Sequence, residues 1–327
     1  MTVKKIAVLG AGGLGLSAIK MLEGKREFLL VALCDRDGYA FSLKGIPSGL
    51  IDRLLPDESV AELSKIGVST KDSIGAIIEK LPKIDGIFIA LPNIPNSFIP
   101  SVVRRFIRAG FKGVMVDVLK RSGAVEQIFK LKSMLKKSGM VYITGAGATP
   151  GFLTTAAALA AQSFKEILKI EIKFGVGIDN WEKYRATIRE DIAHLEGFDI
   201  EKVSKLSNKE IDRILRERKG ILKFQNIEHA DDIILEQVGV VDKSKVSVGG
   251  VVDTTSLKKP ISTQVLVTGV TFEGKVGIHT FTLSDDTTMA DNVCGPAFGF
   301  MKAGFWLKDN GIAGLFTCAD ILPRFVR

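Results

Sequence analysis

In the first half of the chain, short apolar runs alternate with stretches whose apolar residues recur at helical spacing. The pattern predicts strands at 4–9, 28–34, 85–90, 113–118 and 140–144, and helices at 13–23, 71–81, 95–109 and 124–138. Parallel strands need a helix to return the chain between them, so this alternation predicts a doubly wound parallel sheet with helices on both faces. The stretch 37–70 is too irregular for any boundary to be placed.

After Gly151 the pattern changes. A helix rich in small residues is expected at 154–161, and residues 169–176 alternate polar and apolar as a half-exposed strand does. Further segments are helices at 181–194 and 208–219, and strands at 221–226, 245–252, 262–271 and 274–284. Strands that cluster with strands predict a mainly antiparallel sheet, and hence a second, α+β domain. We expect the first domain at 1–150 and the second at 151–289, with residues 290–327 packing back on the first.

The net charge of +8 in 327 residues is confined to one segment. Residues 101–140 contain ten basic and two acidic side chains, whereas the rest of the chain is balanced. Most of these basic positions fall on the outward faces of predicted helices, so neither a nucleic-acid partner nor a membrane partner is expected.

Three cysteines, Cys34, Cys294 and Cys318, lie far apart and form no CxxC pair. Their odd number suits a reducing compartment, and a cytoplasmic location is expected. No pair of histidines has a metal-ligand spacing, so no metal site is predicted. The long uncharged run at 138–164 is interrupted by glycine and proline, which argues against a membrane span.

The residues Gly10-Ala11-Gly12-Gly13-Leu14-Gly15 have the spacing GxGxxG, directly after a predicted strand and at the start of a predicted helix. An acid, Asp35, stands 20 residues beyond the last glycine, at the end of the next strand. This context is typical of a Rossmann dinucleotide site, in which the glycines admit the pyrophosphate and the acid binds the ribose. We therefore expect NAD or NADP as cofactor. Asp35 favours NAD, while the adjacent Arg36 could accept the 2′-phosphate of NADP.

Open parallel sheets bind ligands at the carboxyl ends of their strands, and three loops there carry candidate residues. Leu91, Pro92 and Asn93 are expected near the nicotinamide ribose. Asp117 and Lys120 are candidate catalytic groups, Lys120 as a proton donor or carboxylate contact; the ordinary alternatives are a capping aspartate and a solvated lysine. Gly147 and Thr149 precede a predicted helix, which suits a carboxylate or the cofactor amide.

Arg185 and Arg189 stand one turn apart on a predicted helix and could clamp a substrate carboxylate. The favoured alternative is a solvated face with pairs to neighbouring acids. His194, near the end of the same helix, is a candidate substrate contact. His229 precedes Asp231, whose carboxylate could orient the imidazole for proton transfer, so His229 is a third candidate catalytic group. For both histidines a purely structural role is an equal alternative.

Several runs, spread over essentially the whole chain, resemble the saccharopine dehydrogenase-like oxidoreductases, and most closely the compact, cyanobacterial-type members. They are GAGGLG, VDVLKRSGAVEQ, TGAGATPGFLTTAAALAAQSF, NWEKYRATIREDIAHLEGF, EHADDI, VGGVVDT, HTFTLSDDTTMADNVCGPAFG and GLFTCADILPRFVR. The resemblance implies a Rossmann domain interrupted by a second domain whose sheet forms a dimer interface. It also implies hydride chemistry at a carbon–nitrogen bond.

These observations together predict an NAD(P)-dependent oxidoreductase. Its small-molecule substrate is expected to be a carboxylate-bearing amine of the amino-acid or opine-like (saccharopine) type, and the enzyme is expected to be a homodimer. One alternative keeps the cofactor but acts on an aldehyde or keto group, as homoserine dehydrogenases do. Another is a nucleotide-binding regulator without catalysis, because a glycine fingerprint indicates binding and not chemistry.

Overall fold

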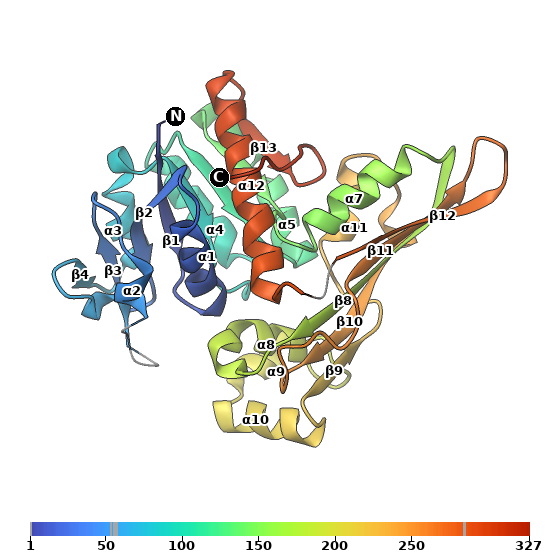
Figure 1. The fold of residues 1–327 in the computed structure, drawn as a ribbon, viewed down its shortest axis with the longest axis horizontal. Helices are drawn as coiled ribbons and strands as arrows, with labels where there is room; N and C mark the ends of the chain where they lie inside the picture. Colours follow the sequence, from blue (N-terminus) through green and yellow to red (C-terminus); the bar gives the residue numbers. More distant parts are fainter. Residues whose placement is uncertain (1, 53, 55–57, 284–285) are drawn as a thin grey trace.

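The computed structural model describes residues 2–52, 54, 58–283 and 286–327, which form two β-sheets with their helices (Figure 1). The parts of the predicted segments 37–70 and 274–284 that fall on residues 53, 55–57 and 284 lie outside the described residues. The first sheet has eight described strands, in the spatial order β13 (Gly314–Thr317), β7 (Val141–Thr144), β6 (Val114–Asp117), β5 (Gly86–Ile89), β1 (Lys4–Leu9), β2 (Phe28–Cys34), β3 (Gly38–Phe41) and β4 (Gly67–Ser69).

The strands from β13 to β2 are parallel, and β3 and β4 add an antiparallel edge. Every residue of β5, β6 and β7 is buried. This is expected of central parallel strands, because their crossover helices cover both faces of the sheet. The carboxyl ends of these three strands therefore open at one edge.

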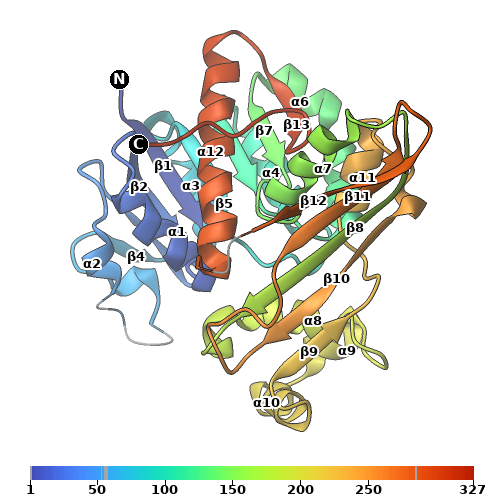
Figure 2. The same cartoon turned by 45° about the vertical axis from the view of Figure 1, so that its right-hand side comes forward.

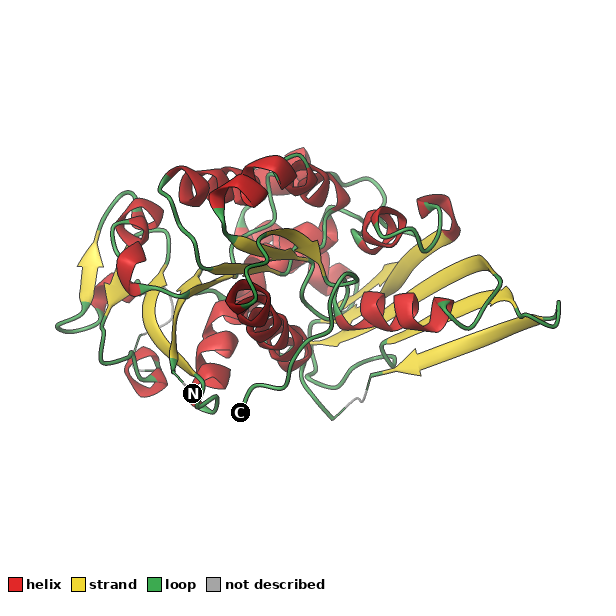
Figure 3. Cartoon of the chain, turned by 90° about the horizontal axis from the view of Figure 1, so that it is seen from above, coloured by secondary structure: helices red, strands yellow, loops and turns green. Residues whose placement is uncertain are grey.

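Helices lie on both sides of the first sheet (Figure 3). The helices of this part are α1 (Gly13–Glu23), α2 (Ser48–Ile51), α3 (Ser73–Ile78), α4 (Phe98–Arg108), α5 (Ser122–Phe129), α6 (Lys132–Ser138) and α12 (Met289–Asp309), with the 3₁₀ turns η1 (Val60–Glu62) and η2 (Leu81–Lys83). The long helix α12 packs on α1, β6 and β7, so the C-terminal segment lies against the first sheet. No helix among the described residues combines the length and apolar character needed to cross a membrane.

The second sheet has five described strands, in the spatial order β12 (Val276–Thr282), β11 (Gln264–Val270), β8 (Glu166–Gly177), β10 (Val246–Asp253) and β9 (Ile221–Phe224). Only the β8–β10 pair is parallel among the described strands, and the other neighbours are antiparallel. The predicted fold class, a Rossmann-type parallel sheet beside an α+β part with a mainly antiparallel sheet, is therefore confirmed.

One face of the second sheet is covered by helices, which lie behind the strands in Figure 2. They are α7 (Phe152–Ala161), α8 (Arg185–Ile192), α9 (Ile200–Lys205), α10 (Asn208–Glu217) and α11 (Asp231–Gln237), with the 3₁₀ turns η3 (Trp181–Tyr184) and η4 (Lys243–Lys245). Along β11 burial alternates: Val265 and Val267 are buried in the core cluster that includes α7, while Leu266 and Val270 remain half-exposed. No described helix covers that opposite face.

The structure also differs from the predicted elements. The stretch 37–70 contains α2, β3 and β4, and the predicted helix 124–138 is two helices. The break occurs where the Leu131 N–H donates to the Ile128 carbonyl (2.8 Å). This bond spans three residues and not the four of an α-helix, so the turn is tighter. Helices α9 and α11 were not predicted, because each is too short to show a helical period. The division at residues 150 and 151 stays a prediction.

Candidate active site

Lys120 lies just beyond β6 and reaches two carboxylates on α8. Its Nζ atom is 2.7 Å from Asp191 Oδ1 and 3.4 Å from Glu190 Oε2. The Lys120 side chain is 23% exposed, whereas those of Glu190 and Asp191 are 2% and 10% exposed. Burial by itself lowers the pKa of Lys120, but attraction to the two carboxylates outweighs it and holds the pKa above its usual value. Lys120 is therefore an ammonium group at neutral pH.

Glu190 is only partly satisfied by the protein. The Asn93 side-chain amide, just beyond β5, donates to Glu190 Oε2 (2.9 Å), the same oxygen that faces Lys120. The other oxygen, Oε1, is buried and has no hydrogen-bond partner among the described residues. A buried acceptor without a donor costs folding free energy, so Oε1 is an unused binding group beside Lys120.

Arg121 joins a third loop to this region. Its Nη2 donates to Glu228 Oε2 (2.5 Å), its Nε donates to Asn96 Oδ1 (2.9 Å), and its Nη1 lies 3.5 Å from His194 Nε2. Burial, together with the positive charges of Lys120 and Arg121, lowers the pKa of His194 to about 4. The imidazole is therefore neutral at physiological pH and contributes no positive charge.

His229 and Asp231 form a buried pair next to the Lys120 backbone. His229 Nδ1 is 2.6 Å from Asp231 Oδ2, and the N–H of the residue after His229 donates to the Lys120 carbonyl (2.8 Å). Asp231 also accepts the hydroxyls of Thr149 (2.8 Å) and Thr154. A carboxylate held in this way fixes the imidazole orientation, which is the arrangement that a proton-transferring histidine needs.

Asp117 lies in the core at the end of β6. Its carboxylate accepts the Tyr142 hydroxyl (2.5 Å), the Thr144 hydroxyl (3.0 Å) and the backbone N–H groups of Leu119 (3.0 Å) and Gly145 (2.9 Å). Burial raises the pKa of Asp117, although the hydrogen bonds act in the opposite direction. The residue joins the ends of β6 and β7, and its two oxygens are already engaged there.

The glycine loop has the close packing that its spacing predicts. Gly10 has φ +107°, and a Cβ on Gly15 would collide with the Gly10 carbonyl, so these two positions require glycine. The start of α1 is covered by η3: a Cβ on Gly13 would lie 2.7 Å from the Lys183 carbonyl oxygen and 2.7 Å from the Tyr184 ring. This side of the loop is therefore occupied by protein.

Asp35 is engaged by its own loop. Its Oδ1 accepts the N–H groups of Asp37 and Gly38 and the Ser59 hydroxyl, each at 2.9 Å, and its Oδ2 accepts the Val60 N–H at 2.7 Å. Arg36 is exposed and pairs with Asp37 (3.2 Å). Neither side chain is positioned as a free ligand for a ribose.

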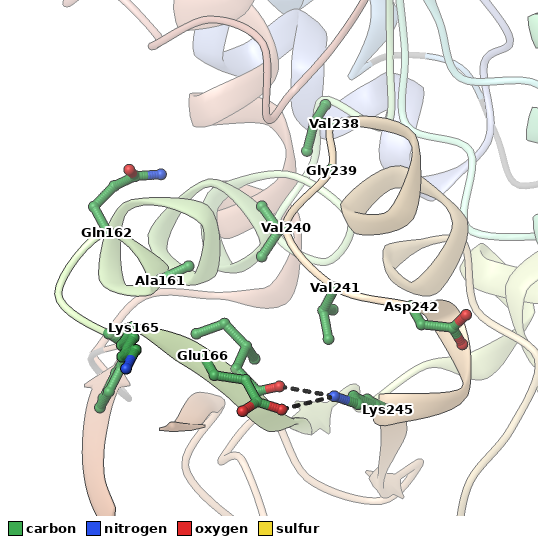
Figure 4. Close-up of a pocket in the computed structure, with 12 residues that line it drawn as sticks. Ala161, Gln162, Lys165, Glu166, Val238, Gly239, Val240, Val241, Asp242 and Lys245 are labelled. Carbon is green, nitrogen blue, oxygen red and sulfur yellow. Dashed lines mark hydrogen bonds and ion pairs between the residues drawn. The ribbon is translucent and has the colours of Figure 1, made fainter. Parts of the chain in front are cut away.

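Two further features lie outside the Lys120 region. A groove of about 390 Å³ runs between the end of α7, the start of β8 and the segment after α11, with the Glu166–Lys245 pair (3.8 Å) on its wall (Figure 4). None of the residues that surround Lys120 lines it. Where the chain is described, no cluster of histidine, cysteine, aspartate and glutamate side chains is arranged to hold a metal ion.

No family model matches the chain. A curated relative aligns with it over nearly the whole length of both proteins. The (S)-8-amino-7-oxononanoate synthase BioU of Haloferax mediterranei is 41% identical over 347 aligned positions, which cover 98% of this chain and 98% of the relative. This chain belongs to the BioU family. It is therefore an enzyme.

Several solved structures with a similar fold are dehydrogenases, each at low identity. An engineered D-amino acid dehydrogenase bound to NADP+ and a DAP dehydrogenase of C. glutamicum each share 16% of residues, cover 98% of this chain and 94% of their own, and have TM-scores of 0.57. A saccharopine dehydrogenase (L-Glu forming) of Saccharomyces cerevisiae shares 12%, with coverage of 97% and 94% and a TM-score of 0.51. These likenesses show the two-sheet fold alone.

Membership of the BioU family corrects the predicted identity. The resemblance to saccharopine dehydrogenase-like oxidoreductases was wrong, and so was the predicted hydride transfer at a carbon–nitrogen bond. The alternative dehydrogenase acting on an aldehyde or keto group fails for the same reason, and a regulator without catalysis does not fit a family of synthases. The runs that suggested dehydrogenases include the glycine loop, which belongs to a fold that the BioU family shares with them.

The prediction of NAD or NADP as cofactor is likewise wrong, because the family is one of synthases. The local geometry agrees with the correction: Asp35 already holds its own loop, Arg36 pairs with its neighbour, and Gly13 is covered by η3. The other residues assigned to the cofactor lose that role with it; they are Gly10, Ala11, Gly12, Leu14, Gly15, Leu91, Pro92 and Gly147. Asn93 instead binds Glu190.

The structure also corrects the predicted arginine clamp. Arg189 donates to the Val203 and Leu206 carbonyls (3.0 and 2.8 Å) and to Asn208 (2.9 Å), so its guanidinium secures the end of α9. Arg185 lies 3.4 Å from Glu182. Because the Arg189 guanidinium is engaged in this way, the two arginines do not form the predicted clamp.

Glu190 and Asp191 were not predicted as site residues, yet they surround Lys120. One sequence signal could have identified Asp191: it lies three residues after Ile188 and one before Ile192, two buried residues of α8. A charged residue on the apolar face of a helix requires a partner. Glu190 carries no comparable signal, because its burial depends on contacts made by other elements.

Proposed function

We propose that this chain is an (S)-8-amino-7-oxononanoate synthase, with that compound held at the Lys120 site. The relative's name supplies the compound, which has a carboxylate at one end and a ketone beside an amine at the other. The single observation that carries the site is Lys120, a partly exposed amine set between the buried carboxylates of Glu190 and Asp191. Lys120 can react with a ketone once it has lost a proton, and Asp191 is the carboxylate placed to accept that proton.

The proposed step is the reversible condensation of Lys120 with the ketone carbon, and its reverse, hydrolysis of the imine, releases the compound as the product of the synthase. The ammonium first passes a proton to Asp191, whose carboxylate is 2.7 Å away. The neutral amine then forms a nitrogen–carbon bond, the ketone oxygen takes up the two protons that the nitrogen loses and leaves as water, and an imine remains. Asn93 orients Glu190, and Glu190 orients the lysine.

Other candidate residues keep proposed roles around this step. His229, oriented by Asp231, is proposed as a second proton-transfer group. The Thr149 hydroxyl donates to Asp231, so we propose that Thr149 positions this pair and does not contact the ligand. His194 stays a proposed substrate contact as a neutral imidazole beside Arg121. For Asp117 we propose a structural role, because its oxygens already accept four hydrogen bonds.

The test is chemical trapping on the full chain. The protein is incubated with (S)-8-amino-7-oxononanoate and cyanoborohydride, digested, and analysed by mass spectrometry. We expect an adduct on the peptide that contains Lys120, equal to the ligand with its ketone oxygen lost. The Lys120→Arg variant should lack the adduct, and the exposed control Lys130→Arg should retain it. An adduct on Lys120→Arg, or none on the unmodified protein, would contradict the proposal.

For the oligomer we propose a homodimer that packs on the uncovered face of the second sheet. Two exposed apolar residues of the edge strand β12, Val276 (68% exposed) and Ile278 (62%), support it, together with the half-exposed Leu266 and Val270 of β11. Sedimentation equilibrium should give twice the chain mass, and Ile278→Lys should shift the measured mass toward that of the monomer. A monomeric mass for the unmodified protein would reject the dimer.

The cytoplasmic location stays a prediction.

A further inference from the structure

Among the described residues, the group of charges around Lys120 has one positive charge fewer than negative charges. Glu190 and Asp191 contribute two carboxylates, whereas Lys120 contributes one ammonium. Arg121 does not make up the difference, because its guanidinium is matched by Glu228. An unmatched charge in a buried ion-pair group is unfavourable, so the group favours a ligand that brings one more cation.

The unused Oε1 of Glu190 shows where that cation belongs. Oε2 already accepts from Asn93 and faces Lys120, while Oε1 is buried without a partner among the described residues. The charge imbalance and the missing hydrogen bond would therefore both be removed by a positively charged donor at Glu190 Oε1. An ammonium group satisfies both requirements. A metal ion is disfavoured, because the described residues contain no cluster suited to hold one.

We propose that Glu190 binds the ammonium group of (S)-8-amino-7-oxononanoate through Oε1 and so selects an amino ketone over a plain ketone. This inference rests on the proposed function, which supplies the ligand. The amine and the ketone stand on adjacent carbons of that compound, just as Glu190 and Lys120 stand side by side in the site. One residue then recognises the amine while the other meets the ketone.

To reach Glu190 Oε1, the ligand has to pass the Lys120 side chain. Oε1 is closed to solvent, and Lys120 is the most exposed of the three charged side chains, so its flexible stem is the part that moves aside. A second ammonium placed beside Lys120 repels its charge and favours loss of its proton. The amine of the ligand thereby promotes the neutral lysine that addition to the ketone requires.

Equilibrium binding of two probes to the full chain tests this assignment. Isothermal titration compares (S)-8-amino-7-oxononanoate with 7-oxononanoate, which lacks only the amine. The unmodified protein should bind the amino compound about tenfold more tightly or better, as a charged hydrogen bond predicts. In Glu190→Gln that ratio should approach one. The ratio is the readout, because loss of the Glu190 charge also acts on Lys120 and changes the affinity for both probes. The matched control Glu182→Gln, an exposed acid of η3, should keep the full ratio.

Both probes carry the same ketone, so the ratio of their affinities reports only what the amine adds. A ratio near one in the unmodified protein overturns the Glu190 assignment and leaves the proposed function standing. A ratio that persists in Glu190→Gln also overturns the assignment, because another group then recognises the amine. If neither probe binds the unmodified protein, the proposed function and this inference fail together. If Glu190→Gln does not fold, the Glu190→Asp variant is used instead. Its preference for the amino compound over 7-oxononanoate must then be smaller than that of the unmodified protein.

Discussion

The Lys120 ammonium and the Asp191 carboxylate lie 2.7 Å apart, although 71 positions separate them in the sequence. Lys120 follows a strand of the first sheet, and Asp191 belongs to a helix that packs on the second. Each is charged and mostly buried, so each depends on the other for its stability. The pair thus connects the two halves of the fold at the candidate active site.

Removing the Asp191 charge should make Lys120 more reactive. The two carboxylates offset the effect of burial and hold the pKa of Lys120 above its usual value, so Asp191→Asn should lower that pKa. Acetylation of Lys120 at pH 8, followed by mass spectrometry, should accelerate by about tenfold for each pKa unit lost. Asp242→Asn, far from the site, is the control. An unchanged rate would show that Asp191 does not hold the lysine charged.

His194 should weaken the fold in mild acid. Burial and the neighbouring cations lower the pKa of His194 to about 4, below the ordinary 6.5. Between those values the unfolded chain binds a proton at His194 that the folded chain does not, so the free energy of unfolding should fall as the pH falls. In urea titrations His194→Gln should reduce this fall, and the exposed control His279→Gln should not. Equal pH slopes for both variants would reject this account.

Asp117→Ala should destabilise the first sheet strongly. The substitution leaves two hydroxyls and two backbone N–H groups without their acceptor in the core. We expect the free energy of unfolding to drop by about 3 kcal/mol or more, measured by urea denaturation. Asp52→Ala removes an exposed carboxylate paired with Lys20 and should change it by less than about 0.5 kcal/mol. A loss as small as that of the control would contradict the structural role.

Gly13→Ala and Gly12→Ala form a matched pair that tests whether η3 covers the glycine loop. A Cβ on Gly13 would press on the Lys183 carbonyl and the Tyr184 ring, whereas a Cβ on Gly12 meets nothing within 4 Å. Overpacking at Gly13 should cost about 1–3 kcal/mol of unfolding free energy, measured by thermal denaturation. Gly12→Ala should be nearly neutral. Similar melting temperatures would mean that η3 does not press on the loop.

Much of the fold could be predicted from the sequence, because parallel strands buried on both faces are short continuous apolar runs. Lys120 was found for the same reason: it directly follows such a run, at the edge where these sheets bind ligands. The cofactor prediction failed at Asp35. Its position after β2 matches a ribose-binding acid, but the loop at Ser59 and Val60 folds over it and uses both oxygens.

The sequence by itself determined most of the strands and the longer helices, and which loops share the carboxyl edge of the first sheet. These properties depend on the local spacing of apolar residues, which can be read along the chain. Only the tertiary structure decided that Lys120 meets Glu190 and Asp191, that Arg189 secures α9, and that one oxygen of Glu190 has no partner. Such contacts join residues on different elements, and they form only when those elements pack together in the folded chain.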